Sequence, residues 1–259
     1  MKPQVYKDPR PPETFTRFYE RTRNQRPDWV YTLVRLVLTP LLVTIWRARC
    51  IDSDKVPASG PVIITPNHFS NLDHFFLAVY LRRPVHFMAK SQMFKRPMQF
   101  IYTHGGVFPV RRGQRDEESF ETARAVLARG DVVVMYAEGG RSRTGELGEP
   151  RPGIGRLALE TGAPVVPSAI AGTERARNWT RLQFPKVTVH YGDPIRFDQV
   201  DEPSREQSQA ASQLIFERVE RLYAGLRSDG RRRVVRAARA ARRAAQRAAR
   251  GAPLAPSRN

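Results

Sequence analysis

Residues 61–76 read PVIITPNHFSNLDHFF, an apolar run followed directly by polar side chains. The run 62–65 is short and rich in β-branched residues, which is typical of a strand buried on both faces of a sheet. Asn67 and His68 follow at its end, and Asp73 comes five residues later, where a helical pattern begins. Because α/β proteins build their sites at strand ends, this stretch predicts an α/β fold with a site beside His68.

On both sides of residues 61–76, from Ser53 to about Pro203, short apolar runs alternate with amphipathic segments. This pattern predicts an α/β domain with a central sheet, mostly parallel or mixed, flanked by helices. The predicted strands are 62–65, 85–89, 107–110, 132–137, 165–170 and 187–191. The predicted helices are 74–81, 93–102, 117–128, 154–160 and 204–226.

His68 and Asp73 are the candidates for catalysis. A neutral imidazole can accept the proton of a hydroxyl, while a carboxylate bonded to its other nitrogen fixes the tautomer and stabilises the imidazolium. A His and an Asp five residues apart are weak evidence by themselves, so a structural hydrogen bond stays open as the alternative. The remaining histidines lack a comparable setting and are expected to be structural or incidental: His74, His86, His104 and His190.

Two other predicted strand ends carry groups suited to binding an anion. Arg111 and Arg112 follow one strand, and the segment 138–142, EGGRS, follows another. Arginine donates paired hydrogen bonds to a phosphate, and glycines let backbone N–H groups approach an anion closely. We expect both segments and His68 to surround one opening at the carboxyl ends of the strands. The strand around Pro167 is expected to line the same opening. Either segment alone also fits a solvated turn.

These blocks resemble the glycerolipid acyltransferases with an NHxxxxD motif, the family typified by 1-acylglycerol-3-phosphate O-acyltransferase. The first block matches in full, including the serine often seen in it: Asn67, His68, Ser70 and Asp73. The second block, GxxFxxR in outline, matches at Gly106 and Arg112. The resemblance covers about residues 55–195.

The third and fourth blocks extend the resemblance. The third is commonly FPEGTRS and is YAEGGRS here, with departures at Ala137 and Gly140. It matches at Glu138, Gly139, Arg141 and Ser142. The fourth block, an apolar run around a proline, corresponds to Pro167.

The resemblance implies a reaction and a role for each block. His68, held by Asp73, would act as general base on the sn-2 hydroxyl of 1-acyl-glycerol-3-phosphate. The hydroxyl would attack the thioester of acyl-CoA or acyl carrier protein and give phosphatidic acid. The candidates for binding the acceptor phosphate are Arg111, Arg112, Glu138, Gly139 and Arg141. No metal or cofactor is implied, because the thioester is a co-substrate.

Residues 29–46, WVYTLVRLVLTPLLVTIW, are mostly apolar, whereas 1–28 are polar and lack the apolar region of a secretory signal peptide. The apolar stretch is barely long enough to cross a bilayer. Arg35 would cost about 2.5 to 3.5 kcal/mol at mid-bilayer, and Pro40 is expected to interrupt the helix. We therefore favour a segment lying in the membrane interface, within an N-terminal region 1–52. A true span and an ordinary buried helix stay open.

Residues 227–259 form a basic tail with 11 arginines and one acidic residue, a net charge of +10. The part 231–250 consists of strong helix formers, with arginines and small apolar residues on separate faces. Because its charges repel one another, we expect disorder until the tail meets an anionic surface. A solvated extension is the alternative. The acyltransferase domain is then predicted to be 53–226.

The whole chain has 259 residues, a net charge of +19 and 41% apolar residues, which suits one catalytic domain with appendages. Its single cysteine, Cys50, excludes an internal disulfide and a zinc module. We expect an intracellular protein, peripheral or monotopic, at the cytoplasmic face of a bacterial membrane. Its expected partners are a lysophospholipid, the acyl donor and the anionic membrane surface, and no specific nucleic acid.

Two alternatives to this function stay open. The same pair of residues could act on another lysophospholipid, a glycolipid or an amino lipid, because the third block departs from the usual sequence. In a different class, the protein could be non-catalytic and bind a membrane or nucleic acid through its basic tail. A serine hydrolase is not favoured, since the sequence contains no GxSxG elbow.

Overall fold

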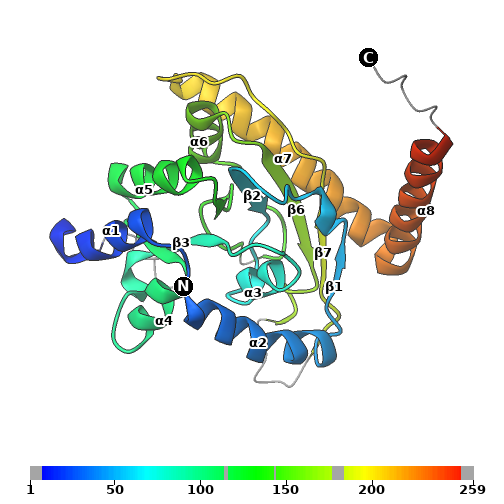
Figure 1. The fold of residues 1–259 in the computed structure, drawn as a ribbon, viewed down its shortest axis with the longest axis horizontal. Helices are drawn as coiled ribbons and strands as arrows, with labels where there is room; N and C mark the ends of the chain where they lie inside the picture. The colour runs from blue at the N-terminus through cyan, green and yellow to red at the C-terminus, as the bar shows by residue number, and fades with distance from the viewer. Residues whose placement is uncertain (1–7, 114–115, 143, 177–183, 252–259) are drawn as a thin grey trace, which may run out of the picture.

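The computed structural model of the chain describes residues 8–113, 116–142, 144–176 and 184–251. They form one seven-stranded sheet with helices on both faces (Figure 1). The strand order is β1-β7-β6-β2-β5-β3-β4, and only β6 and β7 pair antiparallel among the described strands. The prediction of a mostly parallel or mixed sheet flanked by helices is confirmed. The ends of the predicted N-terminal region and tail, 1–7 and 252–259, lie outside the described residues.

The described elements have the following bounds. The strands are β1 (Arg49–Ile51), β2 (Val62–Pro66), β3 (His86–Lys90), β4 (Val107–Val110), β5 (Val132–Val134), β6 (Val165–Ala171) and β7 (Thr188–Tyr191). The helices are α1 (Thr16–Asn24), α2 (Trp29–Thr44), α3 (Asp73–Ala78), α4 (Met98–His104), α5 (Glu117–Ala128), α6 (Pro152–Thr161), α7 (Arg205–Ser228) and α8 (Gly230–Gly251). Short 3₁₀ helices cover Pro12–Phe15, Ser53–Lys55 and Ser91–Met93.

The sheet is buried on both faces, which explains why its strands are continuously apolar. In β2, Val62 and Ile64 belong to a core completed by α2 and α3. Ile63, which points the other way, belongs to a second core completed by α5, α6 and α7. All three side chains are fully buried, and burying each one stabilises the fold by about 1.5 to 3 kcal/mol.

Helix α2 continues through Pro40, so the prediction that this proline interrupts the helix is wrong. An interior proline removes one backbone hydrogen bond and can kink a helix without ending it. Arg35 turns toward the protein and donates to the carbonyl of Val79 over 3.2 Å. Along the described residues, no helix combines the length and the hydropathy needed to cross a membrane.

Three other elements differ from the predictions. The helix expected at 93–102 is replaced by a 3₁₀ turn and α4, and Pro97 lies at the N-cap of α4, where its missing N–H breaks no helical hydrogen bond. The strand expected at 132–137 ends at Val134, where the chain turns toward the edge of the sheet. The short edge strand β1 was not predicted.

The basic tail forms helix α8, so the expectation of a disordered tail is wrong for 230–251. Val234, Val235 and Ala238 pack against a cluster that includes Tyr223 of α7. An isolated helix this rich in arginine would be marginal, and these contacts supply the packing that it lacks.

Candidate active site

Three of the predicted site segments emerge at one edge of the sheet. Neighbouring strands β2, β5, β3 and β4 are parallel, so their carboxyl ends meet there. Residues 67–73 follow β2, residues 111–112 follow β4, and residues 135–142 follow β5. The topology therefore brings the three segments to the same edge, as the sequence predicts.

His68 and Asp73 are in direct contact. Asp73 begins α3, and its Oδ2 atom lies 2.8 Å from Nδ1 of His68. The same oxygen accepts hydrogen bonds from the backbone N–H groups of Phe69, at 2.7 Å, and Ser70, at 2.8 Å. The Asp73 side chain is fully buried. The loop thus folds around one carboxylate oxygen, which explains the spacing of five residues.

The protonation state of His68 follows from its surroundings. Burial lowers the pKa of His68 below 6.5, and the positive charges of Arg141 and Arg112 also lower it, whereas Asp73 acts in the opposite direction. The net shift is downward, so the imidazole is neutral at pH 7. Because a carboxylate only accepts, the ring hydrogen sits on Nδ1 and the Nε2 atom keeps its lone pair.

Tyr136 holds the imidazole from one side. Its ring stacks on that of His68, with 3.8 Å between centroids and 21° between planes. Burial raises the pKa of Tyr136 well above 10, so its hydroxyl stays protonated. Tyr136 was not among the residues singled out from the sequence, where its only signal is that it is the first residue of the third block, YAEGGRS.

Glu138 ties the third block to the first. Its Oε1 accepts from the backbone N–H of His68, at 2.9 Å, and its Oε2 accepts from that of Gly148, at 2.8 Å. In return, the N–H of Ser142 donates to the carbonyl of His68, at 2.9 Å. Gly139 has a φ of +64°, which favours glycine. Glu138 is therefore placed to shape the loop, with its oxygens held by backbone donors.

A pocket opens beside His68 and combines positive charge with apolar walls. Arg112, Arg141 and Lys90 supply the charge, and burial together with the two arginines lowers the pKa of Lys90. The walls include Phe87, Met88, Met93, Tyr102 and Val107. Clustered cations beside apolar side chains suit an anionic amphiphile. Lys90 was not among the residues singled out from the sequence.

The other histidines fall into two groups. His86, His104 and His190 lie within ion-pair distance of aspartates away from the pocket, in line with the structural role expected of them. His74 lines the pocket together with His68. Burial lowers the pKa of His74 to about 4, so this wall of the pocket is uncharged.

Three motif residues support the fold around the site. Asn67 is buried and exchanges two hydrogen bonds with the backbone of Ile170, which joins the end of β2 to β6. Pro167 lies in β6 beside β2. Gly106 has a φ of +80°, and a Cβ there would lie 2.5 Å from Cγ of Pro27. None of these three lines the described pocket.

Arg111 lies outside the pocket, unlike Arg112. Its guanidinium donates to the carbonyl of Arg10 over 3.4 Å, so it faces the N-terminal segment. Ser70 also serves the loop, because its hydroxyl accepts from the N–H of Leu72 at 3.2 Å. Arg111 and Arg112 were both candidates for binding a phosphate, but only Arg112 lies in the pocket.

The sequence profile of the family described as Acyltransferase matches residues 47–171. The chain is 29% identical over 147 residues to 1-acyl-sn-glycerol-3-phosphate acyltransferase from Cocos nucifera. The aligned part makes up 52% of this chain and 46% of that protein. It is 28% identical over 172 residues to a probable 1-acyl-sn-glycerol-3-phosphate acyltransferase from Mycoplasma genitalium, covering 58% and 63%. The matched part spans less than two thirds of either relative.

The fold is similar to a solved structure. The crystal structure of the 1-acyl-sn-glycerophosphate acyltransferase PlsC from Thermotoga maritima superposes with a TM-score of 0.54. The match covers 81% of this chain and 88% of that chain, at 18% sequence identity. At this identity the likeness concerns the fold alone.

Proposed function

We propose that the chain, whose residues 47–171 match the acyltransferase family, transfers a fatty acyl group to the sn-2 hydroxyl of 1-acyl-glycerol-3-phosphate. The product is phosphatidic acid, and the donor is a thioester on coenzyme A or acyl carrier protein. The observation that carries the proposal is the buried contact between His68 and Asp73 beside a pocket lined by Arg112 and Arg141.

In the proposed reaction, Nε2 of His68 is the general base. The acceptor hydroxyl loses its proton to Nε2 as its oxygen attacks the thioester carbonyl carbon. Asp73 stabilises the imidazolium through Nδ1. When the tetrahedral intermediate collapses, the carbon–sulfur bond breaks, and the leaving thiolate takes the proton from Nε2. The residue returns to its neutral form, and no acyl-enzyme forms.

Arg112 and Arg141 position the acceptor in this proposal. Both lie in the pocket with His68, so a phosphate held by their guanidinium groups keeps the hydroxyl of the same molecule near Nε2. Lys90 adds a third positive charge. Glu138 and Gly139 contribute by shaping the loop that carries Arg141. Arg111 has no contact with the phosphate in this arrangement.

We place the protein at the cytoplasmic face of a membrane, where the acceptor and product reside. Apolar side chains on α2 are exposed, with Trp29 at 64% and Leu36 at 70% of their full surface, and Phe100 of α4 is 52% exposed. A helix with such a face lies in the interface and buries it among acyl chains. The fold leaves this face uncovered by the described residues.

An acceptor assay tests the proposal. Purified protein receives one acyl-CoA and a panel of acceptors, namely lysophosphatidic acid, other lysophospholipids, a glycolipid and an amino lipid. We expect product from lysophosphatidic acid, and a loss of about 10²- to 10⁴-fold in rate for His68→Ala. His190→Gln is the matched control, because His190 lies in β7 away from the pocket and should leave the rate unchanged. Full activity of His68→Ala would refute the catalytic role.

A second candidate acceptor is favoured by Gly140. A Cβ built on this glycine would lie 3.5 Å from Nη1 of Arg112, so the missing side chain leaves space beside the guanidinium. That space could admit a phosphate carrying a larger head group. Product from such a lysophospholipid, with none from lysophosphatidic acid, would replace the first acceptor while keeping the role of His68.

A further inference from the structure

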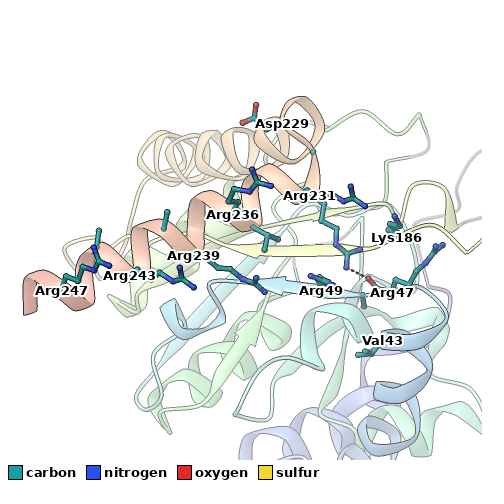
Figure 2. Close-up of a pocket in the computed structure, with 16 residues that line it drawn as sticks. Val43, Arg47, Arg49, Lys186, Asp229, Arg231, Arg236, Arg239, Arg243 and Arg247 are labelled. Atoms are coloured by element: carbon teal, nitrogen blue, oxygen red, sulfur yellow. Dashed lines mark hydrogen bonds between the residues drawn. The ribbon is translucent and has the colours of Figure 1, made fainter. Parts of the chain in front are cut away.

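A basic groove lies between α8 and β1, the outermost strand of the sheet (Figure 2). One wall consists of Arg47, Arg49 and Lys186, which come from the chain around β1 and before β7. The other wall is the arginine-bearing side of α8, with Arg236 and Arg239 among its members. Nine cationic side chains and one carboxylate line the groove within the described residues. We call this feature the basic groove.

The positive charge of the basic groove is not neutralised from within. Among the residues with described side chains, no ion pair involves Arg236, Arg239 or Arg243. At the start of α8, Nη2 of Arg231 donates to the carbonyl of Arg47 over 2.6 Å, while its Nη1 is buried and has no hydrogen-bond partner in the described structure. An unpaired buried donor is costly, and a water molecule or an anion would complete it.

The electrostatics of Arg231 agree with this picture. Burial lowers the pKa of Arg231, and the neighbouring charges of Arg49 and Arg47 lower it further. Crowded cations of this kind are stabilised by a ligand with several negative charges.

The basic groove borders an apolar surface. Val43, near the end of α2, lines the groove and is 41% exposed. Leu36, seven residues earlier and so on the same face of α2, is 70% exposed. Cations therefore meet apolar side chains at this end of α2, which matches a ligand with an anionic head and an apolar body.

Two other uses of α8 fit the described residues less well. No large apolar side chain of α8 is exposed, because Val234 and Val235 pack on the protein. The helix thus lacks the apolar face with which an amphipathic helix inserts into a bilayer. The lining of the groove contains no aromatic residue, whereas single-stranded nucleic acid is usually held by stacking on aromatic rings.

We propose that the basic groove binds the phosphate groups of anionic phospholipids at the bilayer surface, with the exposed face of α2 in the adjacent interface. The tail is then one wall of a defined site, and not a diffuse tether. This inference deepens the membrane part of the proposed function and rests on it. The matched family region, 47–171, ends before α8 begins, so that wall is supplied by residues beyond it.

Vesicle flotation tests the inference. The full chain is mixed with vesicles of phosphatidylcholine, with or without phosphatidylglycerol. We expect binding to the anionic vesicles that weakens as salt is raised. The double variant Arg236→Gln with Arg239→Gln should bind them roughly tenfold more weakly. Because both walls form one site, Arg49→Gln with Lys186→Gln should give a similar loss.

A charge-matched control separates a site from net charge. Arg218→Gln with Arg221→Gln removes the same charge from exposed positions of α7 outside the groove. We expect this variant to bind almost as well as the wild type. Equal losses in all three variants would overturn the inference in favour of diffuse attraction, and so would unchanged binding in the groove variants. Tighter binding of a single-stranded oligonucleotide or an acidic protein, with loss in the groove variants only, would also overturn it.

Acyl transfer measured in detergent micelles keeps this inference separate from the proposed function. The groove variants contain an intact pocket, so their rate on lysophosphatidic acid in neutral detergent should equal that of the wild type. Failure of the wild type in that assay refutes the proposed function, whatever the vesicles show. Full activity combined with no groove-dependent binding refutes only the groove.

Discussion

At His68, burial and a partner carboxylate shift the pKa of the imidazole in opposite directions. Burial disfavours the imidazolium, and so do Arg112 and Arg141, whereas Asp73 favours it. The first group prevails, which leaves a neutral base at pH 7 with its hydrogen directed at Asp73. Besides their proposed role in binding a phosphate, the two arginines thus help to keep the imidazole unprotonated.

This balance can be measured by NMR titration of histidine-labelled protein, with His68→Asn assigning the signal. We expect a midpoint for His68 below 6.5. Arg112→Gln removes a positive charge that opposes protonation, so the midpoint should rise. A midpoint above 6.5 in the wild type, or a fall in the arginine variant, would contradict this account.

At the scale of elements, α6 and α7 approach closely at Gly155. A Cβ at this position would lie 2.0 Å from the carbonyl oxygen of Ser208 and 2.7 Å from the N atom of Ser212. The N–H of Gly155 also donates to the Ser212 hydroxyl, at 2.9 Å. Both helices cover the second core of the sheet, so their spacing positions that layer.

Gly155→Ala should therefore destabilise the protein, by about 1 to 3 kcal/mol or more, because backbone must move to admit the methyl group. Gly225→Ala is the control, since Gly225 lies in α7 with no atom within 4 Å of its Cβ position. It should stabilise the protein by about 0.5 to 1 kcal/mol through helix propensity. Urea denaturation measures both. Equal changes in the free energy of unfolding for the two substitutions would show that the close approach of the helices does not affect stability.

At the scale of the whole molecule, ion pairs fasten the described part of the N-terminal region to the body. Asp131 binds Arg26 as well as Arg129, and Asp28 lies within 2.5 Å of His104. Burial acts to raise the pKa of each carboxyl, but these hydrogen bonds and charges outweigh it and hold the pKa of both aspartates below 3.8. A carboxyl whose pKa is lower in the folded state stabilises the fold above its unfolded pKa and loses that contribution as pH falls.

The urea midpoint should therefore be highest near neutral pH and fall as the pH drops below about 4. Asp131→Asn removes one of the responsible groups, so its midpoint should depend less on pH in this range. Asp201→Asn, at an exposed position, removes the same charge and should keep the full dependence. An Asp131→Asn protein with the wild-type dependence would refute the assignment.

Local sequence determined the strands of the core, though not the edge strand β1, as well as most helices and the contact between His68 and Asp73. Each of the core strands is an apolar run that has to be buried on both faces. The groups that Asp73 binds in His68, Phe69 and Ser70 lie only three to five residues away in the chain. Helix α5 could be predicted from its local pattern, and so could the αL position at Gly162, because glycine readily adopts a positive φ after a helix. These features depend on residues close together in the chain, so the sequence alone can predict them.

Tertiary structure alone decided what lies beside those residues. Tyr136 reaches His68 only because β5 ends at Val134, and Arg111 turns away from Arg112 only because the N-terminal segment packs there. The helix α8 and the basic groove likewise depend on packing against α7 and on the strand β1. Apart from the packing of α8 on the neighbouring α7, these contacts join segments far apart in the chain, and their free energy exists only once the sheet has assembled.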